Sequence, residues 1–215
     1  MRSMFDQQLK TLNEEMLYMG GLCEDTIQQT IEALMSGDVK KARDLNNMMS
    51  QLTQQERSIE NICLKLLMQQ QPVARDLRTI SSSLKMVTDM ERIGIQACEI
   101  AEIIAAGNVV RATDKVDFQE LSDEVSHMVQ MAMMAYDKKN LDLADEVIKY
   151  DDVVDKLFCD IRGDLIEQLK DDTNDAECFI DMLMIDKYFE RIGDHAVNIA
   201  SWVKFSITGE IQIVE

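Results

Sequence analysis

Proline, glycine and aromatic residues are scarce in this chain of 215 residues. It holds one proline and eight glycines, and Phe, Trp and Tyr together make up 5% of it. Because such residues form most tight turns and many sheet faces, their scarcity argues against a fold rich in strands. Hydrophobic residues still account for 46% of the chain, with sixteen methionines among them. The composition therefore predicts a few long helices around a sizeable core.

Basic charge and paired cysteines are lacking as well. The chain has 22 Lys and Arg against 40 Asp and Glu, a net charge of −18. Proteins that bind nucleic acid carry a basic face, so we expect no nucleic-acid partner. No CxxC pair occurs, and the odd number of cysteines suits reduced thiols, which we expect to be small buried hydrophobes. These cysteines are Cys23, Cys63, Cys98, Cys159 and Cys178.

Long apolar runs are also missing. No uncharged stretch approaches the length that a bilayer span requires, and the N-terminal residues contain no apolar leader segment. We therefore expect a cytoplasmic protein that reaches a membrane only through its partners.

What the sequence does contain is an internal duplication. The tetrapeptide Glu-Arg-Ile-Gly occurs at residues 91–94 and again at 190–193, a shift of 190 − 91 = 99 positions. Upstream, Leu52 matches Val154 at a shift of 154 − 52 = 102, so the second copy is about three residues shorter in one connection. We expect one repeat over residues 1–107 and a second over 108–215.

Apolar residues recur at three- and four-residue spacing in both copies, which predicts three helices in each. The fold class that follows is all-α, with two pseudo-symmetric antiparallel three-helix bundles. The expected helices cover about residues 4–35, 73–106, 117–136, 141–170 and 175–205, together with one that begins after an Asp38 cap and ends before Pro72.

Two pairs of acidic residues stand out in the second copy. Asp151 and Asp155 lie on one expected helix and Glu190 and Asp194 on the next, and the i, i+4 spacing stacks each pair on one face. Four carboxylates on adjacent helices would form a hard oxygen site for iron, manganese, magnesium, calcium or zinc in a surface groove. The alternative interpretation is a solvated acidic face.

The corresponding positions of the first copy have lost this pattern. Met49, Thr53 and Ile95 replace three of the carboxylates, and Glu91 alone remains. One carboxylate is too few to hold a hard cation, so we expect the first copy to be empty unless neighbouring acids rebuild the site. The neighbouring acids are Glu56, Glu60 and Glu99.

Two arginines, two glycines and one histidine carry further expectations. Arg92 and Arg191 are expected to pair with acidic groups or to hydrogen-bond between the bundles. Gly94 and Gly193 are expected to permit close helix approach, because glycine within a helix costs roughly 1 kcal/mol. His195 is expected to be a surface or capping histidine rather than a metal ligand.

Taken together, these motifs resemble the PhoU family of phosphate-signalling regulators. The resemblance rests on the repeated Glu-Arg-Ile-Gly, on Gln-Pro-Val-Ala-Arg-Asp-Leu-Arg at 71–78, and on the Asp-His-Ala that begins at Asp194. It implies two three-helix bundles, a likeness to members that bind iron or zinc clusters through E/D-x-x-x-D motifs, and a homodimer. The metal ligands carried over are Asp151, Asp155, Glu190 and Asp194.

The resemblance also implies a role without catalysis. Such a protein is a negative regulator that links the Pst phosphate ABC transporter, through its ATPase PstB, to the sensor kinase PhoR. Two alternatives stay open from the residues: a metal-dependent phosphohydrolase that uses the acidic cluster to activate water, and an accessory of a different phosphate carrier. No Gly-rich phosphate loop and no Ser-His-Asp or Cys-His arrangement occurs in the sequence, which favours the adaptor.

Overall fold

The computed structural model describes residues 2–69, 72–109, 116–171 and 176–210. These residues form seven helices and contain no strand. In chain order the helices are α1 (Arg2–Ser36), α2 (Val39–Asp44), α3 (Asn46–Gln69), α4 (Ala74–Ala106), α5 (Gln119–Lys138), α6 (Leu141–Asp171) and α7 (Ala176–Thr208). The all-α prediction is confirmed.

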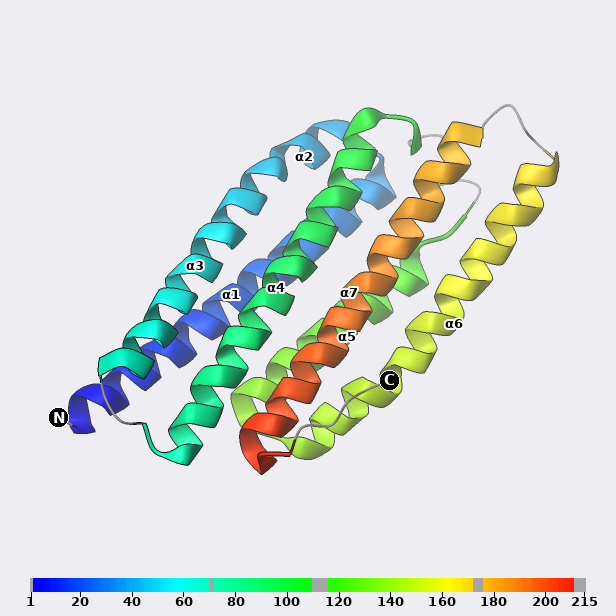
Figure 1. Cartoon of the computed structure of the whole chain (residues 1–215). Coiled ribbons are helices and arrows are strands. Elements are labelled where there is room, and N and C mark those ends of the chain that lie inside the picture. The colour runs from blue at the N-terminus through cyan, green and yellow to red at the C-terminus, as the bar shows by residue number, and fades with distance from the viewer. Residues whose placement is uncertain (1, 70–71, 110–115, 172–175, 211–215) are drawn as a thin grey trace.

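The long helices form two antiparallel three-helix bundles that lie side by side (Figure 1). Helices α1, α3 and α4 make the first bundle, with the short α2 leading into α3, and α5, α6 and α7 make the second. Buried residues recur at helical spacing along these helices. Leu52 in α3 and Val154 in α6, for example, are both fully buried and occupy equivalent positions in the two repeats. The two bundles predicted from the duplication are therefore both present.

The predicted second helix is interrupted at Leu45. As expected, Asp38 caps its start, since Oδ1 accepts hydrogen bonds of 3.0 Å from the backbone N–H groups of Lys40 and Lys41. Beyond Asp44, however, the side-chain amide of Asn47 donates to the Asp44 carbonyl oxygen at 3.3 Å. Asparagine competes with helical hydrogen bonding in this way, which accounts for a break that the apolar pattern did not predict.

Helices α4 and α7, the two copies of the repeated third helix, pack antiparallel at the centre of the molecule (Figure 1). Asn198 of α7 donates to Asp89 of α4 at 3.2 Å, and the Tyr188 hydroxyl of α7 donates to Glu99 of α4 at 3.4 Å. At the shift of 99, Asp89 is equivalent to Tyr188 and Glu99 is equivalent to Asn198. The two contacts therefore join the same pair of repeat positions with the helices exchanged, as a pseudo-twofold axis between α4 and α7 requires.

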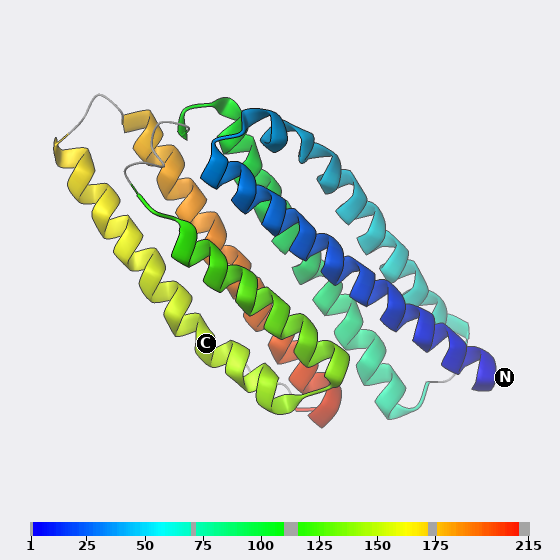
Figure 2. The ribbon, with the colours of Figure 1, turned by 180° about the vertical axis from the view of Figure 1, so that it is seen from behind.

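A second line of contact between the bundles joins α1 to α5, seen from behind in Figure 2. Here Gly20 leaves room for a methionine: a Cβ at this position would lie 2.4 Å from Met133 Cε. Met128 and Met131 are buried in the same helix, and Met134 is 44% exposed. Three of the four methionines on this part of α5, Met128, Met131 and Met133, therefore fill the core, and Met134 does not.

Burial of the cysteines follows the prediction only in part. Cys23, Cys63 and Cys98 are buried, Cys178 is partly buried, and Cys159 is exposed on α6. The expectation was wrong for Cys159, because it lies on the outer face of a helix that covers the core with one side only. None of the described helices combines the length and the apolar character needed to cross a membrane.

Gly94 and Gly193 occupy equivalent positions but differ in the space around them. A Cβ on Gly94 would lie 2.4 and 2.7 Å from the two methyl carbons of Leu52, whereas a Cβ on Gly193 would lie 3.3 Å from its nearest neighbour, Val154 Cγ1. Close helix approach is therefore the reason for glycine at the first position. At the second position the requirement is weaker.

We predict that Gly94→Ala destabilises the protein and that Gly193→Ala leaves its stability nearly unchanged. Overpacking against the fully buried Leu52 costs about 1–3 kcal/mol, more than the roughly 1 kcal/mol that alanine contributes as a better helix former. Thermal unfolding followed by circular dichroism measures both variants. Equal losses of stability in the two would contradict this assignment.

Candidate functional site

The four predicted ligands lie on neighbouring faces of α6 and α7. Asp151 and Glu190 are partly buried, and Asp155 and Asp194 are exposed, so the cluster lies at the surface as expected. Burial, and after it the negative charges of Asp155 and Asp194, raise the pKa of Asp151 to about 6. The structure therefore brings carboxylates from both helices close enough for their charges to interact.

The pKa of Asp194 is raised in the same way. Burial raises the pKa of this carboxyl, the charge of Glu190 raises it further, and Lys187 opposes the change. Gly193 leaves space beside this cluster, since a Cβ there would lie 3.8 Å from Asp151 Oδ1. The acidic residues thus gather along the contact between α6 and α7.

Sequence analysis missed a fifth carboxylate, Asp186. It stands one turn before Glu190 and continues the line of acids on α7 at the i, i+4, i+8 spacing. Its side chain is fully buried, and neither carboxylate oxygen has a hydrogen-bond partner in the described part of the chain. Burial, and next the charge of Glu190, raise the pKa of Asp186 to about 8. The triple periodicity of acids was the signal that could have identified it.

A lysine neutralises part of this charge. Lys187 Nζ lies 2.6 Å from both carboxylate oxygens of Glu190, and the same ammonium lies 5.2 Å from the centre of the Phe158 ring. The guanidinium carbon Cζ of Arg162 lies 5.4 Å from the centre of the same ring. Two cations, Lys187 and Arg162, therefore lie beside the acidic residues.

The donor set fits a hard cation chemically. It consists of carboxylate oxygens from two helices, and the two unpaired oxygens of the buried Asp186 lie one helical turn from Glu190. In the described conformation, however, no group of three or more His, Cys, Asp and Glu side chains is already placed to hold an ion within the described ranges. Coordination would require the carboxylates to turn inward and Lys187 to release Glu190.

The first copy has more acidic residues around Glu91 than the positions aligned with the four predicted ligands imply. Thr53 on α3 donates a hydrogen bond of 2.8 Å to Glu91 on α4, in the register that the duplication predicts. Burial, followed by the charges of Glu60 and Glu91, raises the pKa of Glu56 to about 7. Glu56 and Glu60 therefore do form an acidic cluster with Glu91, whereas Glu99 instead pairs with Tyr188 of the other bundle.

The expectations for the histidine and the two arginines had different outcomes. His195 Nδ1 lies 2.9 Å from Asp89 Oδ1, so this histidine faces the first bundle and is not paired with the four predicted ligands. Arg92 and Arg191 are exposed. Neither forms an ion pair or hydrogen bond with any residue that the structure describes, so the predicted pairing of the two arginines is wrong.

We predict that Asp186→Asn stabilises the metal-free protein at alkaline pH. Because the folded-state pKa of about 8 exceeds the usual value near 4, the stabilising contribution of Asp186 is complete below about pH 4 and is lost as the pH rises through about 8. At pH 8.5 in EDTA the variant should gain about 2 kcal/mol, which for a chain of this length corresponds to roughly 4–8 °C in Tm.

At pH 4 the same variant should differ little from the parent, because Asp186 is then protonated in the folded protein and is not yet largely ionised in the unfolded chain. Asp164→Asn, an exposed substitution on α6, serves as the control and should have no effect at either pH. A gain of stability that is the same at both pH values would show that ionisation of Asp186 is not its cause, and a loss of stability would mean that Asp186 is paired.

Comparison with known proteins agrees with this architecture. The family model described as "PhoU domain" matches residues 16–104 and again residues 118–203. A phosphate-specific transport system accessory protein PhoU homolog from Clostridium acetobutylicum is 35% identical over 97% of this chain and 96% of its own length. The corresponding homolog from Pseudomonas aeruginosa is 32% identical over 95% of this chain and 86% of its own length.

Solved structures give the same result. The crystal structure of PhoU from Pseudomonas aeruginosa matches with a TM-score of 0.90 at 31% identity, covering 96% of this chain and all of that one. The PhoU structure from Streptococcus pneumoniae, at 23% identity and a TM-score of 0.89 over 98% of this chain and all of that one, supports the fold alone. With the family domain matched twice, once in each bundle, the chain belongs to the PhoU family.

Proposed function

We propose that this protein is a regulatory accessory protein of a phosphate-specific transport system and that it acts by binding partners. The observation that carries the proposal is the match of both bundles to the PhoU domain, together with relatives that are aligned over nearly the whole chain and named for that system. In the finer form of the proposal it is a cytoplasmic, dimeric negative regulator that contacts the ATPase PstB and the sensor kinase PhoR.

The character of the surface supports an adaptor. Large apolar side chains are exposed along α6 and α7, with Ile166 at 50%, Ile180 at 59% and Leu183 at 37% exposure, as is common for surfaces that meet other proteins. Neither histidine has one of the four proposed metal ligands as its partner: His195 pairs with Asp89, and His127 is stacked on Tyr150 with ring centres 5.5 Å apart. The acid–base residue most used in hydrolases is thus not paired with these carboxylates.

We predict that the tagged protein captures an ABC-transporter ATPase and a histidine kinase from cells, and that both are released as salt is raised from about 0.05 to 0.5 M. A net charge of −18 steers the protein toward basic surfaces, and salt screens such attraction. Pull-downs from phosphate-starved and phosphate-replete cells, analysed by mass spectrometry, are the measurement. Recovery of another phosphate carrier, or turnover of a phosphoester by the purified protein, would favour the two alternatives.

We also propose that Asp151, Asp155, Glu190 and Asp194 hold a metal ion between α6 and α7. Burial, and after it the mutual repulsion of these acids, raises the pKa of Asp151 and of Asp194, and a bound cation would offset that repulsion. Iron, zinc, manganese and magnesium all suit oxygen donors. The ion would serve to hold α6 against α7.

Replacing both Glu190 and Asp194 by alanine should abolish bound metal after loading with iron, manganese or zinc, whereas Glu91→Ala should leave it unchanged. Elemental analysis of the purified proteins is the readout. The matched control is the double variant Glu56→Ala with Glu60→Ala, because these residues form the acidic cluster of the first bundle. Metal that survives the first change and disappears with the control would place the site on the first copy.

A further inference from the structure

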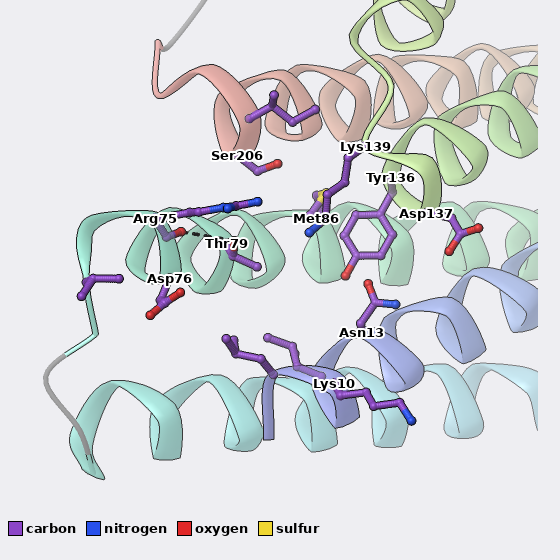
Figure 3. A pocket seen from close by; sticks show the side chains of 14 residues that line it. Lys10, Asn13, Arg75, Asp76, Thr79, Met86, Tyr136, Asp137, Lys139 and Ser206 are labelled. Carbon is purple, nitrogen blue, oxygen red and sulfur yellow. Dashed lines mark hydrogen bonds between the residues drawn. The ribbon is translucent and has the colours of Figure 1, made fainter. Parts of the chain in front are cut away.

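A cavity of about 720 Å³ lies between the two bundles, near the start of α4 and the end of α7 (Figure 3). Its wall comes from α1 and the first turns of α4 in one bundle, and from the end of α5 and the end of α7 in the other. This volume is within the range typical of pockets that hold small organic molecules. The carboxylate cluster between α6 and α7 uses none of its residues.

Three basic side chains lie at this cavity in a strongly acidic protein. Lys10, Arg75 and Lys139 line it beside Asp76 and Asp137, whereas the whole chain carries −18, and Lys10 is itself paired with Glu14 at 3.5 Å. In Figure 3 the side chains of Arg75 and Lys139 extend toward one another from the two bundles, while the two aspartates point away from them. Within the described residues neither cation has an ion-pair partner. Two unpaired cations that converge in a cavity form a site for an anion.

The backbone at Lys139 gives an independent reason to assign a role to its side chain. Lys139 ends α5 with φ 48°, and among the described residues it is the one non-glycine residue with positive φ. Glycine is the residue that adopts this conformation without strain, and it is the common choice at the end of a helix. A lysine here keeps a cation at the cavity at the expense of backbone strain.

The rest of the wall is suited to an uncharged organic group. Leu9, Val73 and Ile207 supply apolar surface, and Tyr136 and Asn13 are among the polar residues of the lining (Figure 3). A pocket with apolar surface and a few converging polar groups is the usual form of a small-molecule site. An inorganic anion alone would leave most of this wall without a contact.

We propose that this cavity binds a small phosphorylated organic molecule, with its phosphate held between Arg75 and Lys139 and its organic part against the apolar wall. The guanidinium of Arg75 can donate two parallel hydrogen bonds to a phosphate, and the ammonium of Lys139 supplies the second charge. Because one cation comes from each bundle, the ligand ties the bundles together. The inference does not depend on the transporter or the kinase of the proposed function.

Calorimetric titration of the full chain with AMP, orthophosphate and adenosine tests the proposal. AMP should bind saturably, orthophosphate at least about tenfold more weakly and adenosine weakly or not at all, with AMP affinity falling as salt is raised. Arg75→Gln and Lys139→Gly should each weaken AMP binding about tenfold or more. Lys85→Gln, an exposed change elsewhere on α4, should leave it unchanged.

Lys139→Gly also separates binding from folding, because glycine relieves the backbone strain and should keep or raise Tm while the ligand is lost. Absence of saturable AMP binding, or AMP binding that is unchanged in both variants, would overturn the proposal. Equal affinity for AMP and orthophosphate would overturn the part that assigns an organic ligand to the apolar wall.

Discussion

The antiparallel packing of α4 on α7 is the constraint on which the other features depend. One helix sequence, used twice, must pack against its own copy and also against its own bundle. Each copy therefore has three faces with different contacts. In α7 one face contacts Asp89 of α4 through His195 and Asn198. A second face packs Gly193 near Val154 of α6, and a third carries Glu190 and Asp194. A substitution on any one face is limited by the other two.

Divergence after the duplication has moved the acidic cluster along the second helix without changing the packing. In the first bundle Glu56 and Glu60 stand where the second has Phe158 and Arg162, at a shift of 102. The reverse change occurs on the third helix, where Asp186 replaces Val87 at a shift of 99. Each bundle thus retains a group of carboxylates with raised pKa, around Glu56 in one and around Asp186 in the other. The pseudo-symmetry of the fold does not extend to the chemistry of its surface.

The comparison of the two copies explains which features the sequence could predict. The six long helices, the antiparallel bundles and the register of Thr53 against Glu91 follow from apolar spacing and from the two constant shifts, because each repeats over many residues. The break at Leu45 does not, since it depends on one Asn47 side chain competing for a carbonyl. Asp186 lies at the border of the apolar face, where neighbouring helices decide whether a residue is covered. The same limit applies to Cys159, which lies on the outer side of α6.

The two proposed sites would act on the same helix through different neighbours. A cation among the carboxylates would draw α6 toward the middle of α7, and an anion between Arg75 and Lys139 would join the first bundle to the second near the end of α7, where Ile207 lines the cavity. Each ligand removes freedom from α7 that the other would also have to remove. Thermodynamic linkage then requires that either ligand changes the affinity for the other by the same factor. A helix that belongs to both the core of its bundle and the contact between bundles would give the proposed adaptor a physical means to report a bound small ligand to protein partners.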